Sequence, residues 1–321
     1  MTNLEKSILK TLIFFDIFDY PLTATEIWKW LYRPGKKYSL SQVRQTLSDS
    51  QFLNKKIDSA EGFYGLQGRI HIFLRSKHNN NLAERKFAKA VRLAKLYRFI
   101  PFVRMIAIVN SLAYSNAKEN SDIDFFIITK RNKIWLARFF SIFFVRMFGL
   151  RPSTESNRDA FCMSFFIEED SLNIKNIMLH SKDIYMPYWV QQMLPIYDPD
   201  GLHQKFLEAN SWFRDYLPNG YANQFSKEVK ENFWTRLFGN IFGFVVSPPI
   251  ISRWLNNVYR RVQTNIIDNN LKSLVNIDTR VIINEKMLKF HANDRREIFY
   301  KKWREKVSKI IKPNSELIIN R

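Results

Sequence analysis

The chain contains Val109-Asn110-Ser111-Leu112-Ala113 and, after a polar loop, Asn120-Ser121-Asp122-Ile123-Asp124-Phe125-Phe126-Ile127-Ile128. The apolar run that begins at Ile123 is typical of a buried strand. Side chains alternate between the two faces of a strand, so Asp122 and Asp124 point to the same face, with their Cα atoms roughly 6.5 Å apart. Two carboxylates in this arrangement are able to bind one Mg²⁺, or two Mg²⁺ ions about 3.5–4 Å apart.

A second buried strand is predicted just upstream, over Met105–Val109, and it ends at Asn110 and Ser111. When a serine leaves a strand and backbone N–H groups follow it at the start of a helix, the turn is suited to binding a triphosphate. The two strands and their connection therefore predict a site for a nucleotide and a divalent metal. The alternative interpretation is a turn capped by Ser121, with both aspartates as solvated loop acids.

These segments resemble the nucleotidyltransferase superfamily, which includes DNA polymerase beta, the aminoglycoside nucleotidyltransferases and the small bacterial nucleotidyltransferase domains. The family pattern is a Gly-Ser turn, a spacer, and Asp-x-Asp or Asp-x-Glu at the start of a strand. Ser111 and Asp122-Ile123-Asp124 match this pattern, whereas Asn110 stands where the family has glycine. Asparagine tolerates a positive φ better than most residues, so the turn is still able to form. The resemblance covers residues 100–170.

The resemblance implies transfer of a nucleoside monophosphate from an NTP to an acceptor hydroxyl, with one or two Mg²⁺ ions as cofactor. The acceptor is a nucleic-acid end, a protein side chain or a small molecule. Asp122 and Asp124 take the positions of the metal ligands and catalytic carboxylates. The residues expected to bind the nucleotide are Asn110, Ser111, Ser121 and Arg131.

The superfamily supplies a third carboxylate from a later strand. The predicted strand Phe161–Ile167 has Cys162 and Ser164 at the matching positions and no acid in its interior. Asp159, just before this strand, is the predicted third catalytic acid, because a carboxylate at a strand entrance is able to turn toward the site. Cys162 itself is interpreted as a small buried hydrophobe.

The charge of the chain is strongly positive. Lysine and arginine number 50 against 30 acidic residues, which gives a formal net charge of +20 at pH 7. Such an excess implies an anionic partner, namely a nucleotide, a nucleic acid such as tRNA or DNA, or an anionic membrane surface.

Cys162 is the one cysteine, so no disulfide forms within the chain and a cytoplasmic location is expected. The five histidines lack zinc-site spacing, which excludes a structural zinc site.

Residues 1–78 are predicted to form a separate winged-helix-like module. Thr23 and Glu26 form a capping box for a second helix, Ser41 is expected to cap a third, and Asn54–Leu66 resembles a short hairpin. The third helix would be a DNA recognition helix, and its alternative role is packing or dimerisation. Its residues expected to face DNA are Gln42, Arg44, Gln45 and Ser48.

The rest of the chain divides into a nucleotidyltransferase-like domain over 79–200, opened by a basic helix over 80–98, and a mainly helical domain over 201–321. The candidate membrane span Leu237–Leu255 is interrupted by Pro248 and Pro249, so no stable span is expected. The predicted fold class is α+β: a nucleotidyltransferase-type mixed sheet with flanking helices, an N-terminal winged helix and a C-terminal helical domain.

Two functional hypotheses follow. The first is the Mg²⁺-dependent nucleotidyltransferase. The second is a catalytically degenerate protein of the same fold that acts as a nucleotide- or DNA-binding regulator, which the asparagine at position 110 and the missing third acid favour. A third hypothesis is a peripheral membrane protein that uses residues 238–251.

Overall fold

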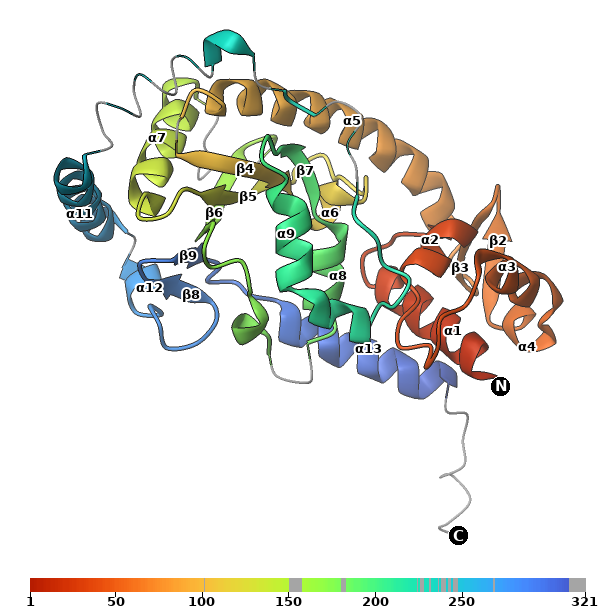
Figure 1. The fold of residues 1–321 in the computed structure, drawn as a ribbon. Coiled ribbons are helices and arrows are strands. Elements are labelled where there is room, and N and C mark those ends of the chain that lie inside the picture. The colour runs from red at the N-terminus through yellow and green to blue at the C-terminus, as the bar shows by residue number, and fades with distance from the viewer. Residues whose placement is uncertain are drawn as a thin grey trace.

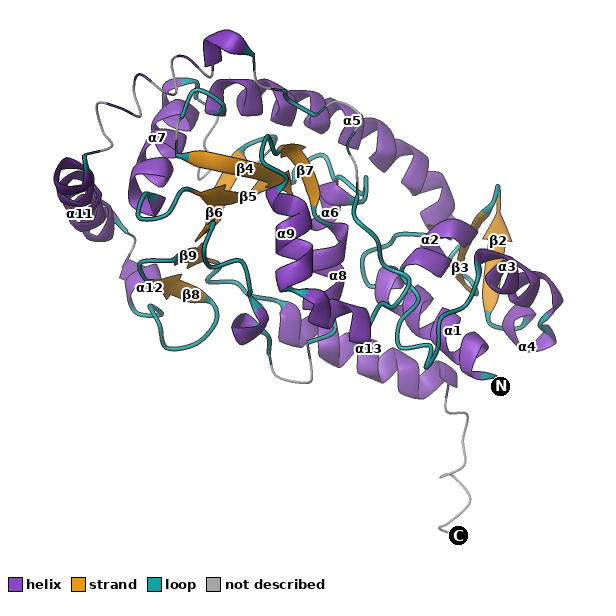
Figure 2. Ribbon diagram, in the orientation of Figure 1, coloured by secondary structure: helices purple, strands orange, loops and turns teal. Residues whose placement is uncertain are grey.

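The computed structural model describes residues 1–100, 102–149, 158–179, 183–223, 248–267 and 269–311, together with positions 225, 228–230, 232–235, 237, 241 and 244. The fold is α+β, with helices around two sheets in the described residues (Figures 1 and 2). No helix within these ranges combines the length and the apolar character needed to cross a bilayer. Phe238 and Phe242, expected at a membrane surface in the third hypothesis, lie outside the described residues.

The N-terminal module is built from short helices and a small antiparallel sheet in the order β1-β3-β2. The predicted capping box of Thr23 and Glu26 is confirmed at the start of α2. The cap of α3 is Ser39 rather than Ser41, because Gln42 stands three residues after Ser39 and completes a second capping box. The elements are α1 (Asn3–Asp16), β1 (Leu22–Thr23), α2 (Ala24–Lys29), α3 (Leu40–Asp49), α4 (Gln51–Asn54), β2 (Ile57–Ala60) and β3 (Phe63–Leu66).

The central sheet is mixed and has the strand order β7-β4-β5-β6-β9-β8. Strands β5 and β6 are parallel, and the other neighbours are antiparallel. The parallel pair is joined by a crossover that contains a helix, as such a pair requires. The strands are β4 (Val103–Ile108), β5 (Ile123–Thr129), β6 (Phe161–Glu168), β7 (Leu194–Tyr197), β8 (Val281–Ile283) and β9 (Met287–Phe290).

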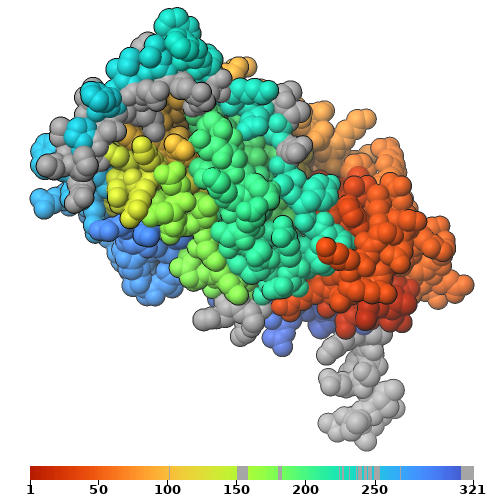
Figure 3. Space-filling view, in the orientation of Figure 1, coloured from red at the N-terminus to blue at the C-terminus, as the bar shows by residue number. Residues whose placement is uncertain are grey.

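Helices cover both faces of this sheet (Figure 1). On one face, Phe125 and Ile127 belong to a core cluster with α5 (His71–Tyr97) and α7 (Ile134–Met147). On the other face, Phe126 and Ile128 belong to a cluster that includes α8 (Tyr185–Gln192), α9 (Leu202–Ala209) and the N-terminal module. Asp124 is two residues before Phe126 and therefore lies on the α8 side of the sheet. The N-terminal module forms one end of the molecule (Figure 3).

The C-terminal segment differs from the predicted helical domain, because β8 and β9 extend the central sheet along β6. These strands have three and four residues, which is too short for an alternating pattern to be recognised. The following helix, α13 (Arg296–Ile311), packs on α1, where Trp303 Nε1 donates to the Lys10 carbonyl at 3.0 Å. The remaining elements are α6 (Asn110–Ala113), α11 (Pro249–Ile266), α12 (Asn269–Lys272) and short 3-10 turns at Lys175–Ile177 and Ser211–Asp215.

Candidate metal and nucleotide site

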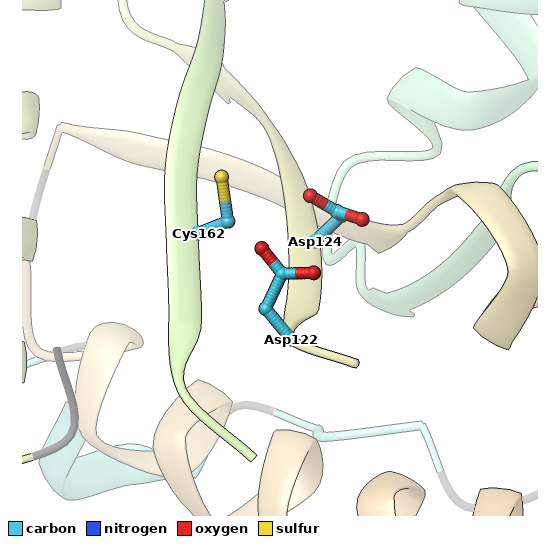
Figure 4. Close-up of side chains that lie close together, drawn as sticks. All are labelled: Asp122, Asp124 and Cys162. Atoms are coloured by element: carbon cyan, nitrogen blue, oxygen red, sulfur yellow. The ribbon is translucent and has the colours of Figure 1, made fainter. Parts of the chain in front are cut away.

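The two aspartates of the Asp-x-Asp motif lie at the entrance of β5, in the middle of the sheet. Cys162 is the residue of β6 directly beside Asp124 in the parallel register. One ligand atom from each of Asp122, Asp124 and Cys162 lies within 4.8 Å of the others. The three side chains converge from two neighbouring strands on one space (Figure 4). We call this group the Asp–Asp–Cys triad.

Burial makes the negative charge of the triad unfavourable. The pKa of Asp124 is raised to about 7, first by desolvation and second by the neighbouring charge of Asp122. The pKa of Asp122 is also raised by burial, although the charge of Lys86 opposes the change. Burial and the charge of Asp124 likewise raise the pKa of the Cys162 thiol. A bound cation would relieve these penalties, because it favours the ionised form of each group.

Asn110 adopts the left-handed conformation after β4, with φ of 60°, which asparagine tolerates better than most residues. Its Nδ2 donates to Asp124 Oδ2 at 2.7 Å. Its Oδ1 accepts from Tyr185 Oη at 3.0 Å and from Trp189 Nε1 at 3.1 Å. The asparagine side chain is therefore fixed by α8 and orients the second aspartate, which no sequence pattern indicated.

Asp159 is not part of this group, contrary to its predicted role as the third catalytic acid. Its Oδ1 lies 2.8 Å from Lys86 Nζ, and its Oδ2 lies 2.6 Å from Lys89 Nζ and 3.5 Å from an Arg85 nitrogen. Hydrogen bonds from the two lysines, and their charges, hold the pKa of Asp159 at about 2 in spite of its burial. The Asp159 carboxylate is thus paired with basic side chains of α5. Cys162, and not Asp159, is the third residue beside Asp122 and Asp124.

The other predicted nucleotide ligands are dispersed. Ser111 is half-buried in the first turn of α6, next to Asn110. Ser121 precedes the triad, and its hydroxyl donates to the Lys118 carbonyl at 2.9 Å, as in the capped-turn interpretation. Arg131 follows the opposite end of β5, roughly 23 Å along the strand from Asp124. It pairs with Asp170 at 3.4 Å and is not brought to the triad by the fold.

Cys162 is supported by a polar chain that the sequence analysis missed. The side chains of Asp124 and Ser164 lie close enough to the Cys162 thiol to affect its pKa. Ser164 Oγ lies 2.9 Å from His291 Nε2. Desolvation lowers the pKa of His291 to about 3, so the ring is neutral at physiological pH. The antiparallel pairing of β6 with β9 brings His291 here, and its distance along the sequence hid this contact.

The donor set of the triad fits a divalent cation. Two carboxylates and one thiol within 4.8 Å of one another are able to surround a single ion. Carboxylate oxygens suit Mg²⁺, Mn²⁺ and Zn²⁺, whereas a thiolate favours the softer ions, Zn²⁺ above all. For a bound ion, the sulfur would therefore shift the preference away from Mg²⁺, the ion expected from the sequence.

The site is thus defined by its own geometry: the Asp–Asp–Cys triad on two neighbouring strands, and an asparagine of positive φ that orients one of its carboxylates. Comparisons with protein-family models, with curated proteins and with solved structures found no match to this chain.

Proposed function

We propose that this chain is a metal-dependent nucleotidyltransferase that transfers a nucleoside monophosphate from an NTP to an acceptor hydroxyl and releases pyrophosphate. The observation that carries the proposal is the convergence of Asp122, Asp124 and Cys162 at the entrance of a central strand. Strand β5 is preceded by a strand that ends in a positive-φ turn at Asn110, which is the order that the family resemblance implies.

Each residue of the site has a role in this proposal. Asp122, Asp124 and Cys162 would hold the divalent ion, which would neutralise triphosphate charge and lower the pKa of the acceptor hydroxyl. Asn110 orients the Asp124 carboxylate through its 2.7 Å hydrogen bond. Ser111, at the start of α6, would contact the triphosphate. Catalysis of this type depends mainly on positioning and charge neutralisation.

The N-terminal module supports a nucleic-acid partner as part of the same proposal. Its helices and its β1-β3-β2 sheet follow the order of a winged helix, with α3 in the place of the recognition helix. The residues of α3 expected to face DNA are all exposed: Gln42, Arg44, Gln45 and Ser48.

A second candidate function is the catalytically degenerate regulator. Two observations favour it: the Asn110 amide already engages Asp124, and a cysteine stands beside the aspartates where a third carboxylate is expected. Such a protein would bind duplex DNA through the N-terminal module, with an affinity that falls steeply with salt.

Calorimetric titration with all four NTPs, each in Mg²⁺, Mn²⁺ or Zn²⁺, tests the proposal. We expect metal-dependent NTP binding by the wild type and none by Asp122→Asn/Asp124→Asn, which keeps side-chain shape but removes both charges. Asp215→Asn, at an exposed position of the 3-10 turn Ser211–Asp215, is the matched control and should bind normally. Absence of NTP binding to the wild type with every metal would refute the enzyme. Salt-sensitive DNA binding that Arg44→Glu weakens would then support the regulator.

A further inference from the structure

A cavity of about 650 Å³ shares one residue, Cys162, with the triad, and neither Asp122 nor Asp124 is among its described lining residues. It lies between the first residues of β6, one side of α7, the last part of α11 and the beginning of α12. Residues that represent these walls are Met163, Ser164, Ile142, Val262, Leu271 and Phe290.

The cavity exists because β6 is paired on only one side near its start. Phe161 and Cys162 pair with β5, whereas the pairing with β9 begins at Phe165 and runs toward the end of β6. The first half of β6 therefore has no second strand beside it among the described residues. Helices α7 and α11 cover this edge without filling it, and Tyr259 of α11 stacks on Phe139 of α7.

The walls are mainly aromatic and aliphatic, and the charged groups at the cavity are cationic. None of its described lining residues is acidic, whereas Arg138 and Arg146 both line it. Arg138 is engaged, since it donates to Gln263 and lies 4.5 Å from the centre of the Phe290 ring. Arg146 is exposed and forms no ion pair with the residues that the structure describes. An occupant therefore needs an apolar body and an anionic group near Arg146.

We infer that this cavity binds the acceptor, and that the acceptor is a small apolar hydroxy compound with an anionic group. This inference rests on the proposed function. The apolar body would contact the rings, the anion would pair with Arg146, and the hydroxyl would lie near Cys162. The acceptor oxygen would then bond to the α-phosphorus while the bond from that phosphorus to the α–β bridging oxygen breaks. Pyrophosphate leaves with the electron pair, and the hydroxyl proton is released to water.

The size and lining of the cavity separate this acceptor from a nucleic-acid end. About 650 Å³ is within the range of pockets that enclose a drug-sized molecule. Polynucleotides are bound in open grooves with several cations placed along the phosphates. The described walls offer one unpaired cation and many apolar side chains, so the lining favours a compact amphipathic ligand.

Fluorescence titration of the full chain with anilinonaphthalene sulfonate, an apolar anion, tests the cavity directly. We expect saturable binding to one site, displacement by ω-hydroxydecanoate and no displacement by the neutral decanediol. Val262→Trp and Ile142→Trp fill the cavity from opposite helices and should abolish binding. Arg146→Glu should weaken it about tenfold, since it reverses the charge that pairs with the anion.

Matched controls are Ile298→Trp on α13 and Arg44→Glu on α3, both at exposed positions that are not among the lining residues. Both should bind the probe like the wild type, and near-ultraviolet circular dichroism should show that every variant is folded. Absence of saturable probe binding to the wild type would overturn the inference. Probe binding by both cavity-filling variants that equals binding by the wild type would also overturn it.

A second readout separates this inference from the proposed function. Pyrophosphate release from NTP should rise with ω-hydroxydecanoate and not with decanoate, which lacks the hydroxyl. Probe binding without NTP binding would refute the nucleotidyltransferase and with it the acceptor role. NTP binding without probe binding would overturn the cavity inference alone. Release stimulated by a nucleic-acid 3′ end and unaffected by the hydroxy acid would also overturn it.

Discussion

Replacing Asp159 with asparagine is expected to destabilise the fold strongly and to leave NTP affinity unchanged. The side chain of Lys86 is completely buried, and its Nζ lies 2.8 Å from Asp159 Oδ1. The same Nζ donates to the Ser121 carbonyl at 2.5 Å. Asp159→Asn therefore removes the carboxylate that pairs with this buried ammonium, whereas Asp122, Asp124 and Cys162 keep their own contacts.

The magnitude follows from these contacts. Removing one partner of a buried ion pair costs about 3–5 kcal/mol, because the remaining charge is uncompensated. Lys86 retains a carbonyl acceptor, which places the expected loss near the lower limit, at about 3 kcal/mol. Lys89 is 38% exposed, so its lost pairing adds little. Lys86→Met should cost only about 1 kcal/mol, because Lys89 still neutralises the carboxylate.

Urea unfolding at pH 7, with calorimetric NTP titration of the folded variants, is the assay. The double variant Lys86→Met/Asp159→Asn should be more stable than Asp159→Asn, since it removes the orphaned charge. The pKa of Asp159 is about 2, below the unfolded value of about 3.9, so its stabilisation is present above pH 4 and is lost as the pH falls toward 2. If Asp159→Asn lost NTP binding but kept normal stability, this reasoning would be refuted. Asp159 would then be assigned to the nucleotide site, as the sequence predicted.

Three further predictions concern the site itself. Cys162→Ser should lower Zn²⁺ affinity more than Mg²⁺ affinity, and Cys162→Asp should raise Mg²⁺ affinity; competition calorimetry giving unchanged metal selectivity would contradict the role of the sulfur. His291 has a pKa of about 3 against about 6.5 unfolded, so the fold should lose stability as the pH falls below 6.5, by about 2 kcal/mol at pH 5. Urea unfolding of His291→Gln should not show this loss of stability between pH 6.5 and pH 5. Asn110→Gly should raise metal-dependent NTP affinity but destabilise the fold by about 1–3 kcal/mol, because Tyr185 and Trp189 lose an acceptor; an unchanged denaturation midpoint would exclude this explanation.

The features that were predictable from the sequence are those determined by residues close to one another along the chain. The alternating faces of β5 fixed the common direction of Asp122 and Asp124, and their proximity requires no knowledge of any other strand. The helix cap at Thr23 is equally local, since both partners lie within one turn. The positive φ of Asn110 followed from a residue type and a turn.

Features that depend on strand pairing were not predictable in this way. Cys162 lies beside Asp124 because β5 and β6 pair in parallel with these two residues in register. The sequence of either strand alone does not reveal this pairing. Lys86 belongs to a helix face rich in lysine and arginine, a composition typical of a solvent-exposed face. In the structure its side chain is fully buried and contacts Asp159. Asp159 does lie beside the motif, since its backbone N–H donates to the Ser121 carbonyl, but its carboxylate pairs with two lysines of α5, which its own segment does not indicate.

The contact between α1 and α13 has a consequence for synthesis of the protein. Asp16 and Lys306, which are 290 positions apart in the sequence, form an ion pair. At translation rates of about 5–20 residues per second, α1 emerges from the ribosome roughly 15–60 s before the helix that covers it. During that time part of its apolar surface lacks its native cover, so chaperone binding to the nascent chain should centre on α1 until α13 is released.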